Sequence, residues 1–199
     1  MIRTFVAVPL PESWIAYATG VTAELSKAVR GVSWVRPENL HFTIRFLGDL
    51  GESGVSRVGD AVARGAEGAR APSATLGALG VFPSWARPRV VWLGLAAGDE
   101  ALREVGRAVN EAIDRAGFDR ADKPFRPHLT LGRVREGAAG LEALRAAPLP
   151  PAPPPASLDR IVVMKSDLHP SGARYTALRE QFIFKVFIYS LSAFIWVET

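Results

Sequence analysis

The sequence of 199 residues contains no cysteine, only four lysines and only three histidines. The missing cysteines exclude disulfide bonds, thiolate zinc sites, iron–sulfur clusters and a cysteine nucleophile. Glycine (18) and proline (15) follow no short period, which excludes a collagen-like chain, and 48% hydrophobic residues exclude a disordered one. A chain of this length can therefore bury a core of its own, as one domain or as two closely packed lobes.

The charge is slightly positive, because 24 lysines and arginines outnumber 20 aspartates and glutamates. Arginine supplies 20 of those 24 cations. A small excess spread along the chain is typical of a solvated surface, and it would also suit a partner that carries phosphate groups.

Long hydrophobic runs are missing except at the C-terminal end. Residues 1–10 lack the features of a signal peptide, so we expect a cytoplasmic protein with no membrane partner. Residues 182–197 are nearly all apolar, but these 16 residues fall short of the ~20 that a membrane-spanning helix needs. An exposed run of this kind promotes aggregation, so we expect the tail to be covered in part by a second copy of the chain.

Hydrophobic spacing predicts three helices and six strands. The helices are expected over residues 14–29, 54–68 and 102–117, and the strands at 2–8, 41–47, 75–82, 90–95, 128–134 and 158–166. Six prolines within residues 148–155 exclude a helix or an inner strand there. Several of the strands alternate with period two, which favours a mostly antiparallel α+β sheet.

A His-apolar-Thr-apolar motif occurs twice, as HFTI at residues 41–44 and as HLTL at residues 128–131. Regular alternation along a strand predicts one polar and one apolar face. The polar set would be His41, Thr43, Arg45, His128 and Thr130, and the apolar set Phe42, Ile44, Phe46, Leu129 and Leu131. A lone copy would be an ordinary strand with a hydrogen-bonded histidine. Two copies 87 residues apart instead indicate an internal duplication that places two imidazoles in one groove.

Paired imidazoles suit the displacement of a phosphodiester. One imidazole accepts a proton from the attacking oxygen and the other donates a proton to the leaving oxygen. The threonine hydroxyls can donate hydrogen bonds to the phosphoryl oxygens. The spacing does not decide which histidine is the acid. Two histidines without a neighbouring cluster of carboxylates make a poor metal site, so we expect no metal and no cofactor.

Two segments carry a resemblance to a known family. Residues 34–48 (WVRPENLHFTIRFLG) and 124–133 (PFRPHLTLGR) resemble the two signatures of the 2H phosphoesterase superfamily. Within it, the chain is most similar to the RNA 2′,3′-cyclic phosphodiesterases of the LigT/ThpR-like type, and residues 3–8 and 166–175 also resemble family positions. The resemblance implies a bilobal α+β domain over residues 1–181, with two pseudo-twofold-related antiparallel sheets and outer helices around a central groove. Residues 182–199 depart from the family pattern.

The resemblance also implies an activity and a role for each motif residue. It implies metal-independent hydrolysis of RNA 2′,3′-cyclic phosphate ends to 2′-phosphates, with weak 2′-5′ ligation as the reverse reaction. His41 would be the proton donor and His128 the proton acceptor, while Thr43 and Thr130 would bind the phosphate. The partner would be a tRNA-like RNA or an oligoribonucleotide.

Other side chains near the motifs are weaker candidates. Arg45, Arg126 and Arg133 could contact RNA, although surface salt links are an equally good use of single arginines. Phe5, Trp34 and Tyr175 could stack on a base, but core packing is the commoner use of such residues. Two other functions stay open: a 2H enzyme for a small cyclic nucleotide or an ADP-ribose cyclic phosphate, and a non-catalytic module that binds RNA ends. The second would not need both histidines.

Overall fold

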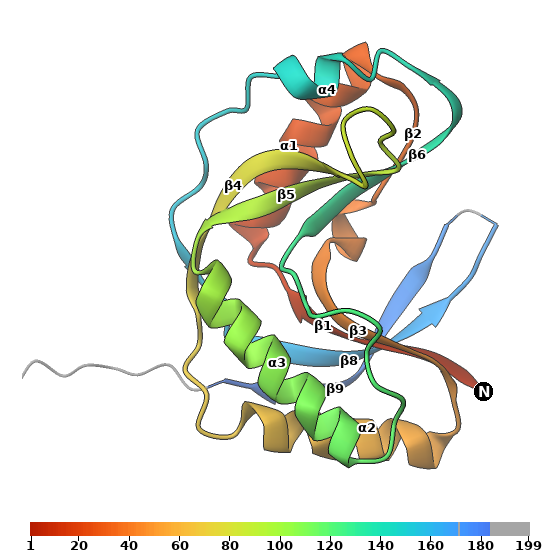
Figure 1. The fold of residues 1–199 in the computed structure, drawn as a ribbon, viewed down its shortest axis with the longest axis vertical. Helices are drawn as coiled ribbons and strands as arrows, with labels where there is room; N and C mark the ends of the chain where they lie inside the picture. The colour runs from red at the N-terminus through yellow and green to blue at the C-terminus, as the bar shows by residue number, and fades with distance from the viewer. Residues whose placement is uncertain (171, 184–199) are drawn as a thin grey trace, which may run out of the picture.

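The computed structural model describes residues 1–170 and 172–183, and within these ranges nine strands form one curled sheet with helices packed against it (Figure 1). The strands are β1 (Ile2–Pro9), β2 (Arg30–Trp34), β3 (His41–Leu50), β4 (Ser73–Phe82), β5 (Val90–Ala97), β6 (Leu129–Ala139), β7 (Ala156–Ser157), β8 (Arg160–Asp167) and β9 (Arg174–Phe182). The helices are α1 (Glu12–Ala28), α2 (Glu52–Ala66), α3 (Asp99–Arg115) and α4 (Ala143–Ala146), and a 3₁₀ turn, η1, covers Pro37–Asn39.

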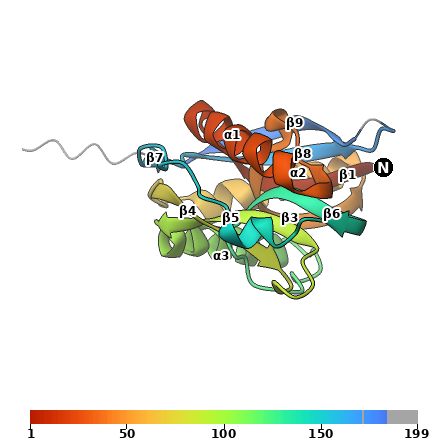
Figure 2. The ribbon, with the colours of Figure 1, turned by 90° about the horizontal axis from the view of Figure 1, so that it is seen from above.

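The sheet is antiparallel throughout, in the order β7-β4-β5-β6-β3-β1-β8-β9, with β2 beside β6. Its two halves meet between β3 and β6, which pair only at Phe42 and Leu129. We call the half with β3, β1, β8, β9, α2 and α3 the β3 lobe, and the half with β6, β5, β4, β7, β2, α1 and α4 the β6 lobe (Figures 1 and 2). Each lobe holds one His-x-Thr motif, so the predicted bilobal α+β fold is confirmed, with the two sheets joined into one.

The apolar stripes of the helices form the core between them and the sheet. In α1 the buried residues are Trp14, Ala18, Val21 and Leu25, at the spacing that predicted this helix. In α2 the hydrophobic signal is diluted by Gly65, which lies where the helix touches α3. A Cβ at Gly65 would fall 2.6 Å from the Cα of Val109, so only glycine allows the two helices to come this close.

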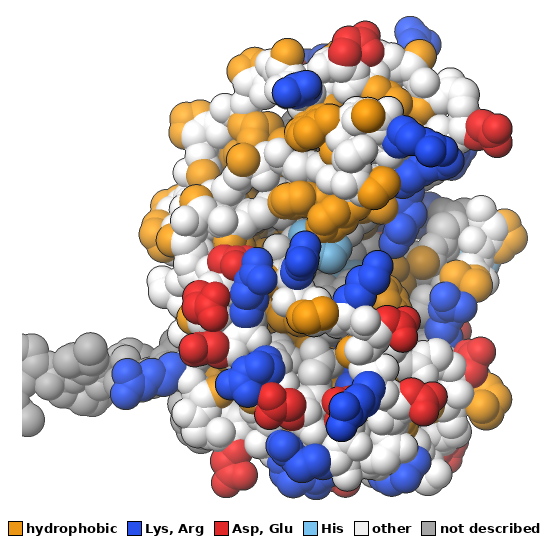
Figure 3. All heavy atoms as spheres, viewed as in Figure 1, with side chains coloured by type: hydrophobic (Ala, Val, Ile, Leu, Met, Phe, Trp, Pro, Cys, Tyr) orange, Lys and Arg blue, Asp and Glu red, His pale blue; other side chains and the backbone are white. Residues whose placement is uncertain are grey.

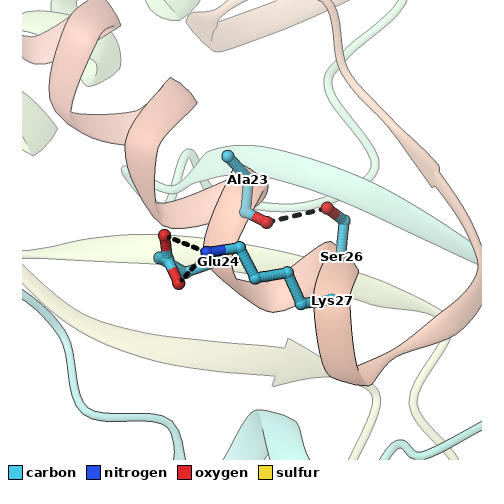
Figure 4. A network of polar contacts seen from close by, with 4 residues as sticks. All are labelled: Ala23, Glu24, Ser26 and Lys27. Atoms are coloured by element: carbon cyan, nitrogen blue, oxygen red, sulfur yellow. Dashed lines mark hydrogen bonds and ion pairs between the residues drawn. The ribbon is translucent and has the colours of Figure 1, made fainter.

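The solvent face of α1 is held by local polar contacts near its C-terminal end (Figure 4). The Lys27 Nζ donates to both carboxylate oxygens of Glu24, at 2.7 and 2.8 Å, and the Ser26 hydroxyl donates to the carbonyl oxygen of Ala23 at 2.8 Å. The ion pair is about two-thirds exposed on both sides, so it adds only a few tenths of a kcal/mol. The helix is therefore stabilised by its buried stripe.

All predicted helices and strands are present, and the structure adds elements without a periodic signal. These are β2, β7, β9 and the single turn α4. The proline-rich segment forms no regular element from Ala147 to Pro155. It is tied to α1 instead, because the Tyr17 hydroxyl donates to the carbonyl oxygen of Pro150 at 3.1 Å and the Trp14 indole N–H to that of Pro154 at 3.4 Å.

The described chain continues just past residue 181, where we predicted the domain to end. Strand β9 ends at Phe182, and Ile183 is buried, with its backbone N–H bonded to the Asp159 carbonyl oxygen at 2.8 Å. The rest of the tail, for which we predicted cover by a second copy, lies outside the described residues. Among the helices that the structure describes, none is long and apolar enough to cross a membrane.

Candidate active site

The two motifs lie side by side on the central strands. Phe42 and Leu129 pair across the lobe boundary and are fully buried. Neighbouring residues of a strand point to the opposite face, so the motif histidines and threonines share the other face of the sheet. The pairing of Phe42 with Leu129 brings the two motifs next to each other at the lobe boundary. Figure 3 shows histidine side chains at the bottom of a hollow, bordered by hydrophobic, lysine and arginine side chains.

A main-chain carbonyl fixes the orientation of the His41 ring. The Nδ1 of His41 lies 2.7 Å from the carbonyl oxygen of Asn39, and its Nε2 lies 2.9 Å from the Thr43 hydroxyl. A carbonyl oxygen can only accept, so Nδ1 carries a hydrogen. The neutral ring therefore has its lone pair at Nε2, and the charged ring has its second N–H there.

His128 is held in the same way. Its Nδ1 lies 2.7 Å from the carbonyl oxygen of Arg126, which is again the residue two positions before the histidine. The same argument places a hydrogen on Nδ1 and leaves Nε2 as the atom that can gain or lose a proton. The duplicated motif thus presents the same nitrogen atom of both rings for proton transfer.

Aromatic side chains of the β3 lobe pack around His41. The ring centroids of Phe5 and Tyr175 lie 5.0 and 5.4 Å from that of His41, and those of Phe5 and Tyr175 lie 4.9 Å apart. Phe5 comes from β1 and is 1% exposed, whereas Tyr175 comes from β9 and is half-buried. Both rings therefore lie beside the histidine, one of them as part of the core.

His128 has a second pair of aromatic neighbours in the β6 lobe. The centroids of Phe82 and Trp92 lie 5.1 and 6.4 Å from that of His128, and these two rings stack on each other at 5.0 Å. They come from β4 and β5. Sequence reasoning missed this pair. The period-two pattern could have placed Trp92 on the groove face, but nothing in the sequence tied Phe82 to the histidine.

The surroundings of His41 lower its pKa below the ordinary value of 6.5. Burial of the ring is the largest cause, because it disfavours the charged form. The hydrogen bond to the Asn39 carbonyl acts in the opposite direction, and the like charge of His128 adds to the lowering. The two imidazoles are thus close enough for the charge of one to affect the other.

Arg45 does not share the groove face with His41, so that prediction is wrong. Residue Ala7 of β1 pairs with Thr43, and the preceding Val6 pairs with Arg45, which leaves Ile44 as an extra residue in β3. Such a β-bulge reverses the alternation. Arg45 is consequently turned to the buried face, where it is 5% exposed.

The buried guanidinium of Arg45 binds the end of α3 and the segment after it. Its Nη1 donates to the Asp114 carboxylate at 2.6 Å and to the Asn110 carbonyl oxygen at 3.2 Å, and its Nη2 donates to the Asp119 carbonyl oxygen. The side chain has almost no exposed surface for RNA to contact. It joins β3 to the segment that leads to the second motif.

The bulge places Phe46 in the groove, although the sequence pattern predicted a buried side chain. Phe46 is 64% exposed, and its ring centroid lies 5.6 Å from that of Phe5. Strand β6 has the same irregularity: Trp92 pairs with Thr130, and the preceding Val91 pairs with Gly132. Arg133 follows His128 by five residues, just as Phe46 follows His41. It therefore lies on the groove face and is exposed.

The remaining candidates separate into rim and core. Arg126 is exposed next to the second motif, and its carbonyl oxygen holds His128. Trp34 packs over Gly132, where a Cβ would lie 2.7 Å from its ring, so it is not placed to stack on a base. Within the described ranges, no three His, Asp or Glu side chains are grouped as they would be around a metal ion.

Two lobes that each bring a His-x-Thr motif to one shared groove form the arrangement of a phosphoesterase with paired histidines. The family model of the 2′-5′ RNA ligase superfamily matches residues 11–170, and the chain belongs to that superfamily. The matched range begins just before α1 and contains both motifs.

Curated relatives support the same assignment. The RNA 2′,3′-cyclic phosphodiesterase of Thermotoga maritima is 32% identical over 180 residues, which cover 90% of this chain and 94% of the relative. The enzyme of the same name from Thermus thermophilus is 31% identical over 193 residues, covering 90% and 89%. That from Archaeoglobus fulgidus is 39% identical over 135 residues, covering 67% and 73%.

Solved structures share the fold. The crystal structure of a Thermus thermophilus protein is 28% identical and superposes with a TM-score of 0.70, covering 92% of this chain and 98% of its own. Escherichia coli LigT in complex with 3′-AMP is 24% identical, with a TM-score of 0.71 and coverage of 92% and 99%. The two lobes together therefore correspond to nearly the whole of these proteins.

Proposed function

We propose that the chain hydrolyses the 2′,3′-cyclic phosphate at an RNA end to a 2′-phosphate, with His41 as the proton donor and His128 as the proton acceptor. The observation that carries the proposal is the matched orientation of the two imidazoles. Both rings are fixed through Nδ1 by a carbonyl oxygen at 2.7 Å, and both offer Nε2 for proton transfer. Relatives named RNA 2′,3′-cyclic phosphodiesterase support the choice of substrate.

The reaction needs one proton to be accepted and one to be donated. The neutral Nε2 of His128 takes a proton from a water molecule as the water oxygen forms a bond to phosphorus. The bond from phosphorus to the 3′-oxygen breaks, and the charged His41 donates its Nε2 proton to that oxygen. The product carries a 2′-phosphate, and the two rings return to their starting states by proton exchange with solvent. No metal or cofactor enters these steps.

The threonines would hold the phosphate during this displacement. The Thr43 hydroxyl lies 2.9 Å from Nε2 of His41, next to the proton that is donated. Thr130 has the equivalent position in the second motif, two residues after His128. Each hydroxyl can donate a hydrogen bond to a non-bridging oxygen, whose negative charge increases in the transition state.

The rest of the RNA end would lie along the groove. Arg126 and Arg133 are exposed near His128 and can neutralise backbone phosphates. Phe46 is exposed near His41 and offers a ring on which a base can stack. We expect a tRNA-like end or an oligoribonucleotide in the cytoplasm. Run in reverse, with a 5′-hydroxyl in place of water, the same groups would form a 2′-5′ linkage.

The product of the reaction tests the proposal. A 5′-labelled oligoribonucleotide ending in 2′,3′-cyclic phosphate is incubated with the protein in EDTA, and the end group is identified by chromatography against 2′- and 3′-phosphate standards. We expect a 2′-phosphate. A 3′-phosphate would reject the assigned leaving group, and turnover that depended on added metal would reject the two-histidine mechanism.

Parallel reactions separate the possible substrates. Adenosine 2′,3′-cyclic monophosphate and an ADP-ribose cyclic phosphate are compared with the oligoribonucleotide at equal concentration. We expect the highest kcat/KM for the oligoribonucleotide. A preference for either small molecule would assign the groove to that class. Tight RNA binding without any product would indicate a binding module.

A further inference from the structure

Asn39 makes two hydrogen bonds that join the first motif to the last strand. Its carbonyl oxygen accepts from Nδ1 of His41 at 2.7 Å. Its side-chain Nδ2 donates to the carbonyl oxygen of Ala173 at 2.8 Å, across 134 residues of sequence. One residue at the end of η1 thus contacts both the imidazole and the segment that enters β9.

The start of β9 lies at an edge of the sheet. Among the residues that the structure describes, this strand is the last in the sheet order and pairs with β8, which sets Asp167 opposite Arg174 and Ser166 opposite Tyr175. The end of an edge strand opens more easily than an inner strand. The bond from Asn39 to Ala173 adds a fixed point two residues before Tyr175.

Tyr175 is the residue through which this fixed point reaches the site. Its ring meets the His41 ring edge to face, with 5.4 Å between centroids and an interplanar angle of 82°. It also contacts Phe5, whose ring centroid lies 5.0 Å from that of the imidazole. A shift at the start of β9 would therefore move one of the two rings that pack against His41.

We propose that Asn39 is a positioning residue whose side-chain amide fixes the start of β9 so that Tyr175 packs against the imidazole of His41. The consequence for turnover rests on the proposed function, but the consequence for the position of the rings does not. The two hydrogen bonds of Asn39 can be tested separately. Substitution of its side chain removes the bond to Ala173, but the main-chain carbonyl oxygen that accepts from His41 remains.

A double-mutant cycle with Asn39→Ala and Tyr175→Leu tests the proposal by NMR. The chain has three histidines, so each ring resonance is assigned by its disappearance in a single His→Gln variant. We expect Asn39→Ala to move the His41 resonance in the direction seen with Tyr175→Leu, since both reduce the ring-current effect of the tyrosine. A His41 resonance that Asn39→Ala leaves in place would overturn the proposal.

The control is Tyr17→Phe, which also removes a hydrogen bond between distant segments, the one to Pro150, but in the β6 lobe. It should leave the His41 resonance and the activity as in the unaltered chain. Asn39→Ser is a second variant, in case alanine lowers the yield of folded protein. If Tyr17→Phe moved the His41 resonance as much as Asn39→Ala, the effect would be general and the proposal would fail.

The kcat/KM values of the same variants provide a second test of the double-mutant cycle. Loss of the hydrogen bond from Asn39 should lower kcat/KM by about tenfold. The double variant should be no worse than the poorer single variant, because both act on the same ring. If the loss of kcat/KM in the double variant equalled the product of the two single losses, Asn39 would act by a route that does not involve Tyr175. If the unaltered chain did not turn over cyclic phosphate at all, the proposed function would fail while the NMR cycle still decided the role of Asn39.

Discussion

The guanidinium of Arg45 and the carboxylate of Asp114 form an ion pair beneath the groove, with 2.6 Å between Nη1 and Oδ1. The side chain of Arg45 is 3% exposed and that of Asp114 is 30% exposed. Arg45 follows Thr43 by two residues on β3, and Asp114 lies in the last turn of α3, before the segment that leads to His128. The pair therefore connects two stretches of chain that are each continuous with a histidine motif.

Replacing Arg45 with methionine should lower the free energy of unfolding by about 3 kcal/mol. This value is at the lower end for a broken buried ion pair, because water can still reach the carboxylate of Asp114. Urea unfolding measures the loss. The control is Arg107→Met, which breaks an exposed pair with Glu111 (2.7 Å) on the same helix and should cost less than about 0.5 kcal/mol. Equal losses would show that the burial of Arg45 contributes nothing.

Replacing either motif histidine with glutamine should lower kcat on the cyclic phosphate by a factor of about 10² to 10⁴, since each removes one proton-transfer group. His169→Gln is the matched control and should keep full activity, because this third histidine lies in the exposed loop after β8. Single-turnover kinetics isolates the chemical step. The roles would be refuted if His41→Gln or His128→Gln retained the rate of the unaltered chain.

The charged form of His41 that donates the proton should be lost at a pH below 6.5 in the free protein. The donor His41 must be charged, and burial lowers its pKa, so the active form is lost as pH rises through that lowered value. NMR titration of the free protein checks the assignment. His128→Gln should raise the pKa of His41, because the like charge is removed. Titration of His41 above 6.5 in the unaltered chain would contradict the prediction.

Removing the exposed ring of Phe46 should weaken RNA binding without slowing the chemical step. For Phe46→Ala we expect KM for an oligoribonucleotide to rise about tenfold, the effect of one lost stacking contact, with kcat nearly unchanged. Phe182→Ala is the control, because that ring is almost equally exposed (62% against 64%) but lies at the end of β9. A fall in kcat with constant KM would instead place Phe46 in the proton-transfer step.

The class of fold and the two motifs could be predicted from the sequence, because both depend on short periodic patterns. Alternation correctly places the histidines and threonines on one face of their strands. It fails two residues later, where the extra Ile44 turns Arg45 inward and Phe46 outward. A β-bulge depends on how two backbones pair, and the residue types in β3 do not predict it.

Contacts between distant segments were also beyond the sequence. Strand β9 is mostly polar and exposed, so it has no hydrophobic alternation, yet it brings Tyr175 to His41. The bond between Asn39 and Ala173 depends on the folded arrangement alone. The positions that hold and enclose the histidines were therefore harder to predict than the histidines themselves.

The carbonyl oxygens that orient the two imidazoles belong to the main chain, so the side chains at those positions have no part in keeping the tautomers. Residues 39 and 126 can therefore differ without disturbing either ring. One copy has asparagine, which reaches across to Ala173, and the other has arginine, which is exposed at the rim. The side chains at these two equivalent positions can therefore serve different functions, while their main-chain carbonyl oxygens orient both imidazoles in the same way.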